Sequence, residues 1–282
     1  MVEHRRFGNW LPHLVLLTGV AIVAFPVYLA IIASTQDNAL IANGQMPLYP
    51  GSHGLETYWN TIVSGAGRTS RQPVGSMMLA SLAMALGIAF GKIAISIISA
   101  YAIVFFSFPF RMTAFWTIFI TLMLPVEVRI FPTYKITSDM HMLDSYSGLI
   151  LPLIASATAT LLFRQFFMTI PKELVEASKI DGAGPIRFFF DTLLPLSVTN
   201  IAALFVILFL YGWNQYLWPL LITTSSSMDT IVIGITKMIG TGDAQTDWNL
   251  IMSTAMLAML PPVAVILLMQ RWFVKGLVET EK

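Results

Sequence analysis

The sequence has 282 residues, of which 56% are hydrophobic and only 11% charged, and its formal net charge is +1. A soluble domain carries roughly 25% charged residues, so this chain cannot cover itself with polar surface and must be surrounded largely by lipid. The small net charge argues against nucleic acid as a partner. The absence of cysteine excludes disulfides, thiolate metal sites and cysteine nucleophiles, and the four scattered histidines indicate no metal site.

Apolar segments long enough to cross a membrane recur along the chain. A transmembrane helix needs about 20 apolar residues. Six segments qualify: Leu11–Ala33, Met77–Phe106, Met112–Tyr134, Tyr146–Phe167, Thr199–Ile222 and Leu250–Gln270. The first is interpreted as a retained helix, because it is longer than the apolar part of a usual signal peptide and no clear cleavage site follows; a signal peptide is the alternative. The sequence therefore predicts an all-α membrane protein with about six transmembrane helices.

The distribution of Lys and Arg predicts the orientation of these helices. With the N-terminus in the cytoplasm, ten positive residues fall on the cytoplasmic side and four outside, so both chain ends are expected in the cytoplasm. Four regions follow from this topology. They are residues 1–34, a tail with the first helix; 35–73, a long external loop; 74–272, a core of five helices; and 273–282, a cytoplasmic tail.

The second predicted helix contains a single charged residue, Lys92. Lys92 is expected to reach along its helix toward the cytoplasm, and contact with a solute is the alternative. The surrounding run Gly87–Ile93 is similar to a phosphate-binding loop but is one residue short and lacks the Ser or Thr. The run also lies inside an apolar helix, so we expect another chain to handle ATP.

Charged residues also end the third predicted helix, where Glu127 and Arg129 lie between Pro125 and Pro132. Each proline removes a backbone donor and bends the chain, so a regular helix is not expected here. By rise per residue, Arg129 lies about 25 Å from the inner surface. Charges at such a depth usually face a cavity or a partner. A solute pathway and an ion pair at the external interface remain alternatives.

The longest cytoplasmic loop spans residues 171–195 and does not have the composition of a loop. Pro171 is typical of a helix start. The run Asp181–Pro185 is expected to break the helix, and a second short helix with three phenylalanines follows. The pattern predicts a helix–turn–helix elbow at the inner membrane surface. An ordinary amphipathic helix lying on the membrane is the alternative.

The fifth predicted helix carries aromatic and amide residues, in Tyr211-Gly-Trp213-Asn214-Gln215-Tyr-Leu-Trp218-Pro. Asn214 lies about 22 Å along this outward-running helix, close to the depth of Arg129. We predict that Asn214 and Gln215 face a cavity, with Trp213 beside them. For Trp218 an aromatic belt at the membrane interface is favoured.

The loop from 171 to 195 carries a resemblance to a known family. Glu176-Ala177-Ser178, three residues, Gly182, then Leu194-Pro195 resembles the EAA loop of ABC importer permeases, with Ser178 and Thr192 as mild departures. The resemblance implies a type I importer permease fold. It further implies that Glu176, Ala177, Ser178, Asp181 and Gly182 contact a cytoplasmic ATPase subunit and couple its closure to the membrane helices.

Within the maltose-permease-like group, the chain is most similar to the second permease subunits of sn-glycerol-3-phosphate importers. The segments that carry this similarity are Ile120–Thr133, Leu143–Tyr146, Phe163–Thr169 and Tyr211–Leu220. From their charge, polarity and similar depth, we predict a solute pathway with Arg129, Glu127, Asn214, Gln215 and Trp213. The resemblance also implies a second permease, two ATPase subunits that bind ATP and Mg²⁺, and an external solute-binding protein. Arg suits a phosphate monoester because it can bind two oxygens at once.

Three functions are compatible with these features, two from the same family and one from a different class. The favoured one is a permease subunit in the bacterial inner membrane for glycerol 3-phosphate or glycerophosphodiesters, without enzymatic activity, cofactor or metal of its own. A permease for a neutral oligosaccharide in the same family is the first alternative. A stand-alone secondary transporter is the second, but such proteins commonly contain internal repeats and intramembrane carboxylates. No repeat is evident here, and Glu127 is the only acid placed well inside a predicted span.

Overall fold

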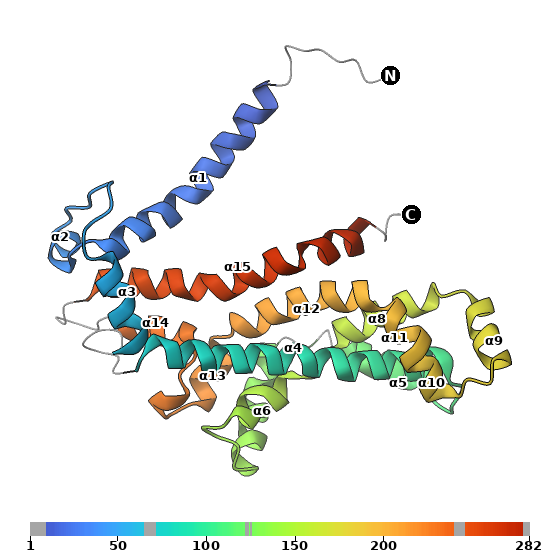
Figure 1. Cartoon of the computed structure of the whole chain (residues 1–282). Coiled ribbons are helices and arrows are strands. Elements are labelled where there is room, and N and C mark those ends of the chain that lie inside the picture. Colours follow the sequence, from blue (N-terminus) through green and yellow to red (C-terminus); the bar gives the residue numbers. More distant parts are fainter. Residues whose placement is uncertain (1–9, 65–71, 122–123, 125, 240–245, 279–282) are drawn as a thin grey trace. The chain divides into compact units, whose positions relative to one another are not determined.

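The computed structural model describes residues 10–64, 72–121, 124, 126–239 and 246–278, without the side chains of residues 126, 127 and 273–278. All secondary structure in this part is helical, as predicted (Figure 1). The α-helices are α1 Trp10–Thr35, α2 Asn38–Ala42, α3 Gly54–Val63, α4 Val74–Phe105, α5 Arg111–Ile120, α6 Val126–Asp139, α7 Tyr146–Ile150, α8 Ala157–Met168, α9 Lys172–Ile180, α10 Pro185–Phe188, α11 Leu194–Leu196, α12 Val198–Trp213, α13 Leu217–Ile222, α14 Ile231–Met238 and α15 Trp248–Val278. The short 3₁₀ helices η2 Leu151–Leu153 and η4 Ser226–Met228 and the π-helix η3 Phe189–Leu193 connect some of them.

Three described helices are long and apolar enough to cross a membrane: α1, α4 and the part of α15 from Trp248 to Trp272. Two bent pairs raise this number to five if each pair is one span. The first pair, Tyr146–Leu153 with Ala157–Met168, bends by 48°, and the second, Pro185–Leu196 with Val198–Trp213, bends by 71°. Six spans therefore remain a prediction, because the predicted third helix is interrupted between α5 and α6.

The predicted helices are more broken than their hydropathy indicated. The segment Thr199–Ile222 is not continuous, because α12 ends at Trp213 and α13 begins at Leu217. In contrast, Pro132 does not end a helix, since α6 continues through it to Asp139. A helical proline leaves carbonyls of the preceding turn short of a donor. Next to it, the Thr133 hydroxyl donates to the carbonyl of Arg129 at 2.7 Å.

The described chain forms two compact units. The first unit combines residues 1–76 with 234–259. Hydroxyl pairs join its helices, with Ser34 Oγ 2.9 Å from the Tyr58 hydroxyl and Thr61 Oγ1 3.0 Å from Ser253 Oγ. Asn38 also accepts a hydrogen bond from the Trp248 N–H at 2.8 Å. The predicted external loop 35–73 thus contains two helices, α2 and α3.

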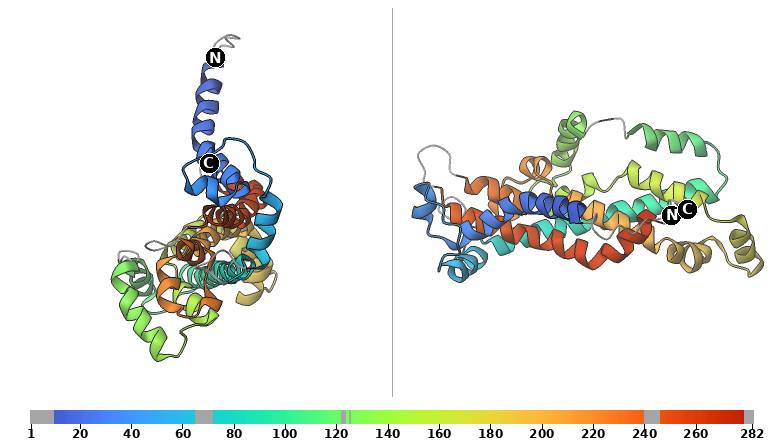
Figure 2. Two further views of the ribbon diagram at one scale, coloured as in Figure 1. Left: turned by 90° about the vertical axis from the view of Figure 1, so that its left-hand side faces the viewer. Right: turned by 90° about the horizontal axis from the view of Figure 1, so that it is seen from above.

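The second unit combines residues 77–233 with 260–282. Within it, α9 lies at one end of α4, and α6 and α13 lie toward the other end (Figures 1 and 2). At the α9 end, the Tyr101 hydroxyl donates to the carbonyl of Pro185 at 2.8 Å. A core of buried apolar residues supports the other end. It consists of Met84, Ile88, Ile130, Leu149, Trp218 and Ile222.

A carboxylate ties together two connections at the α6 and α13 end. Asp144 accepts hydrogen bonds from the backbone N–H groups of Thr224 and Ser225, both at 2.7 Å, and from the Thr224 hydroxyl. The Ser225 N–H, followed by the Thr224 hydroxyl, holds the pKa of Asp144 below its ordinary value of 3.8, because these donors stabilise the charged form. The loop after α6 and the loop after α13, which the charge bias placed on the same external side, are thereby joined.

Replacing Asp144 with asparagine is expected to lower the melting temperature of the purified chain at pH 7. Since the folded-state pKa lies below the unfolded one, the stabilisation is complete above about pH 4 and is lost as pH falls through the folded value. The difference between variant and wild type should therefore shrink from pH 7 to pH 3. Asparagine also tolerates the positive φ of 50° at this position. An equal difference at both pH values contradicts the role of the charge.

Candidate functional site

A pocket of about 70 Å³ lies inside the second unit, where broken helices converge. It is lined from α4 by Lys92, from α6 by Arg129, Ile130 and Thr133, from η2 and the segment after it by Pro152, Leu153 and Ala155, from α12 by Tyr211 and from α13 by Trp218. Non-helical backbone at membrane depth is tolerated where it is buried in protein or lines a cavity. The breaks before α8 and before α13 therefore have a structural reason at this place.

Two cations line this pocket. Lys92 is 7% exposed, and its Nζ lies 3.7 Å from the centroid of the Tyr211 ring. The expectation that Lys92 reaches toward the cytoplasm is thus wrong, because its ammonium group is held over the ring. Arg129 lines the same pocket and is exposed in the isolated chain. No carboxylate occurs among the described residues of the lining. The arrangement favours an anion over a neutral or cationic solute.

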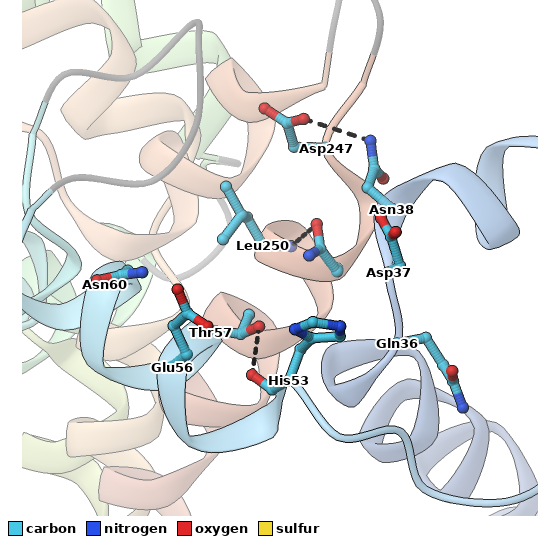
Figure 3. Close-up of a pocket in the computed structure, with 10 residues that line it drawn as sticks. Gln36, Asp37, Asn38, His53, Glu56, Thr57, Asn60, Asp247 and Leu250 are labelled. Atoms are coloured by element: carbon cyan, nitrogen blue, oxygen red, sulfur yellow. Dashed lines mark hydrogen bonds between the residues drawn. The ribbon is translucent and has the colours of Figure 1, made fainter.

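A second and larger pocket, of about 360 Å³, lies in the first unit (Figure 3). It is lined by Gln36, Asp37, Asn38, His53, Glu56, Thr57, Asn60, Asp247, Asn249 and Leu250. Three carboxylates make it unsuitable for an anion. Its polar groups also hold the local fold: Asp37 accepts from the Ala39 N–H at the start of α2, and Asn38 donates to Asp247 at 3.3 Å. The pocket is thus lined by groups that hold α2 and the start of α15.

Two glycines of α4 let the segment from Ile150 to Ile154 approach this helix closely. A Cβ at Gly87 would lie 2.6 Å from Cδ1 of Ile150, and one at Gly91 would lie 2.5 Å from Cγ2 of Ile154. Both distances are too short for real atoms. Glycines in the run similar to a phosphate-binding loop therefore serve helix packing, as small residues often do between membrane helices.

The sequence favoured an interfacial aromatic belt for Trp218, and this prediction is wrong. Trp218 is part of the pocket wall. Its side chain is 3% exposed, and its Nε1 donates to the carbonyl of Gly148 at 3.1 Å. In a continuous helix that carbonyl would accept from residue 152, which is proline and has no N–H. The indole therefore satisfies a carbonyl that the helix break leaves free.

Trp218→Phe should destabilise the chain by about 1–3 kcal/mol, because the Gly148 carbonyl is then buried without a donor. The measurement is the melting temperature of the purified chain in detergent. Trp59→Phe makes the same change at a side chain that is 68% exposed and serves as the matched control. A Trp218→Phe variant as stable as Trp59→Phe contradicts a structural role for the indole hydrogen bond.

The other predicted pathway residues are not among the described residues that line this pocket. Trp213 is 3% exposed and stacks on Phe209 with ring centroids 5.9 Å apart. Asn214 is exposed where α12 ends, and the side-chain amide of Gln215 donates to the carbonyl of Tyr211 at 3.1 Å. The Glu127 side chain lies outside the described residues. Lys92, Tyr211 and Trp218 were missed as wall residues, although a lone lysine inside an apolar helix was a usable signal.

The predicted elbow is present at the other end of the second unit. Helix α9 spans Lys172–Ile180, Asp181 caps it, and Gly182 follows with a φ of 73°. Glu176, Ala177, Asp181 and Gly182 are exposed and Ser178 is half-buried. No residue of α9 is buried in the isolated chain, although isolated helices this short are marginal in water. The surface of α9 is therefore uncovered in the isolated chain.

The second half of the elbow packs against α4 of the second unit through aromatic rings. Phe188 of α10 lies 5.4 Å from Phe105 and Phe189 lies 5.1 Å from Tyr101, measured between ring centroids. Phe105 also contacts Phe167 of α8 at 5.9 Å. Tyr101 lies nine residues after Lys92 on α4, about 14 Å along the helix. A movement of the elbow can therefore be transmitted to the helix that lines the pocket.

Comparison with known proteins agrees with this arrangement. Residues 77–279 match the family described as "Binding-protein-dependent transport system inner membrane component". This chain belongs to that family. The sn-glycerol-3-phosphate transport system permease protein UgpE of Rhizobium meliloti (strain 1021) is 58% identical over 282 residues, covering all of both chains. The protein of the same name from Pectobacterium atrosepticum is 56% identical over the same length.

A solved structure with a similar fold agrees with this family assignment. It is described as a bacterial ABC transporter involved in the import of the acidic polysaccharide alginate. The TM-score is 0.81 with 15% sequence identity, covering 97% of this chain and 99% of the other. The type I importer permease fold expected from the EAA-like loop is therefore supported by structural similarity. The chain is a membrane component of a transport system and not an enzyme.

Proposed function

We propose that this chain is one permease subunit of an ATP-driven importer for sn-glycerol 3-phosphate or glycerophosphodiesters. It forms half of a pathway that opens alternately to the outside and the cytoplasm. Full-length identity of 58% to a permease named for sn-glycerol 3-phosphate supports the solute. The observation on this chain that carries the proposal is the pocket with Lys92 and Arg129, because a phosphate group requires positive partners.

The proposed pathway includes Arg129, Glu127, Asn214, Gln215 and Trp213. The pocket of this chain is smaller than the roughly 300–1,000 Å³ of usual ligand sites, so a second permease is needed to complete it. Asn214 is exposed where α12 ends, and we assign it to the surface that faces that second permease.

The proposed coupling site is the exposed helix α9 with its cap. Glu176, Ala177, Ser178, Asp181 and Gly182 contact one of two cytoplasmic ATPase subunits, which bind ATP and Mg²⁺. An external binding protein delivers the solute. The proposed topology has six spans and both chain ends in the cytoplasm of a bacterial cell. Residues 1–34 hold the first helix, 35–73 an external region, 74–272 the permease core and 273–282 a cytoplasmic tail.

Uptake in cells tests this proposal. Cells that lack this chain should lose uptake of radiolabelled glycerol 3-phosphate, and expression of the chain should restore it. Excess unlabelled glycerophosphodiester should compete with the labelled solute, whereas a neutral oligosaccharide should not. Competition by the oligosaccharide alone would overturn the proposed solute and favour a sugar permease.

A further inference from the structure

Burying the charged side chain of Lys92 on α4 costs free energy, which a purely structural role does not explain. This charge is buried among apolar helices, and no carboxylate among the described residues of its pocket balances it. The face of the Tyr211 ring stabilises the ammonium group instead. A ring offers no hydrogen-bond acceptor equal to an anionic oxygen, so the three N–H donors of Lys92 keep capacity for a stronger partner.

Arg129 adds a second positive charge to the same pocket. Two like charges in a poorly solvated space repel each other, and an anion between them removes this repulsion. A singly charged phosphodiester needs one of these cations, whereas a phosphate monoester with two charges can use both. The pair of cations can therefore distinguish a phosphate monoester from a phosphodiester, which a single arginine cannot do by charge.

We propose that Lys92 determines charge specificity in the pathway, binding a doubly charged phosphate together with Arg129 after leaving the ring of Tyr211. The inference rests on the proposed function, because it assigns a solute class to that same pocket. Between transport cycles, when no solute is bound, the ammonium group of Lys92 then contacts the ring of Tyr211. The recognised chemistry is a phosphate monoester dianion. The phosphate of an anionic lipid is the other source of an anionic phosphate group, and the test separates it from a solute.

The test uses the whole transporter, with its partner permease, ATPase subunits and binding protein, in vesicles of neutral phosphatidylcholine or with added phosphatidylglycerol. The KM for glycerol 3-phosphate uptake is measured at pH 5.5 and 7.5. The second ionisation of a phosphate monoester lies near pH 6, so its dianion increases about fourfold over this interval. A glycerophosphodiester keeps one charge throughout and serves as the reference solute.

Wild type should have a KM for glycerol 3-phosphate about fourfold lower at pH 7.5, relative to the diester. Lys92→Met and Lys92→Gln should lose this pH dependence, and Lys92→Arg should retain it. Lys135→Met removes the same charge from an exposed position of α6 and should behave as wild type. ATP hydrolysis stimulated by the binding protein shows beforehand that each variant assembles, and a role in packing alone would leave the pH dependence unchanged.

Two results overturn the inference while leaving the proposed function intact. One is a neutral Lys92 variant with wild-type pH dependence. The other is a Lys92→Met effect that occurs only with phosphatidylglycerol and equally for both solutes, which assigns the site to lipid. If the wild-type complex takes up neither phosphate compound, the proposed function itself is wrong.

Discussion

Gly182→Val is expected to lower ATP-driven uptake about tenfold while leaving the amount of membrane-inserted chain unchanged. Gly182 has a φ of 73°, and this left-handed conformation costs other residues roughly 1–2 kcal/mol, with a larger cost for β-branched ones. The neighbouring Ala183 N–H donates to the carbonyl of Ser178 at 2.9 Å, so the glycine sets the angle between α9 and α10. A Cβ there would meet no atom within 4 Å, and a loss must therefore come from the turn.

Gly182→Asn is the matched control for the turn, because asparagine tolerates the left-handed region. It should retain most uptake and most ATPase binding. The measurements are uptake into vesicles and the yield of ATPase subunit that co-purifies with the chain. If valine and asparagine reduce both quantities equally, the side chain and not the turn is responsible. If valine changes neither quantity, the elbow is not the coupling site.

Arg129→Ala should reduce the uptake of glycerol 3-phosphate by about 10–100-fold. A hydrogen bond to a charged group contributes about 1.5–3 kcal/mol, and arginine can make two such bonds to one phosphate. Initial rates over a range of solute concentrations measure the effect. Arg271→Ala removes an exposed arginine from α15, outside the pocket, and should leave uptake unchanged. Unchanged transport in Arg129→Ala would remove this residue from the pathway.

The parts of this molecule that depend on local sequence were predicted well. The elbow follows from Pro171 and the Asp181–Pro185 break within a single loop, and α9 and α10 occur there. The long apolar helices α1, α4 and α15 follow from hydropathy alone. A continuous apolar run of this length predicts a helix whether its side chains later contact lipid or a partner protein.

The parts that depend on packing between distant segments were not predicted. The place of Trp218 is decided by a carbonyl that Pro152 leaves free, and Lys92 is held by a ring 119 positions later in the chain. Hydropathy considers each helix in isolation. It therefore predicted Trp218 at the membrane interface and Lys92 reaching toward the cytoplasm. Helix breaks at 214–216 were hidden in the same way, because aromatic residues keep the segment apolar.

We propose that this chain forms half of a solute pathway, driven by ATPase subunits that are separate chains. Accumulation of radiolabelled glycerol 3-phosphate in vesicles tests it most directly, with the complete transporter, loaded binding protein and ATP on the side of α9. We predict accumulation against a gradient that stops when ATP, the ATPase subunits or this chain is omitted. Accumulation by this chain alone, or without ATP, would contradict the account.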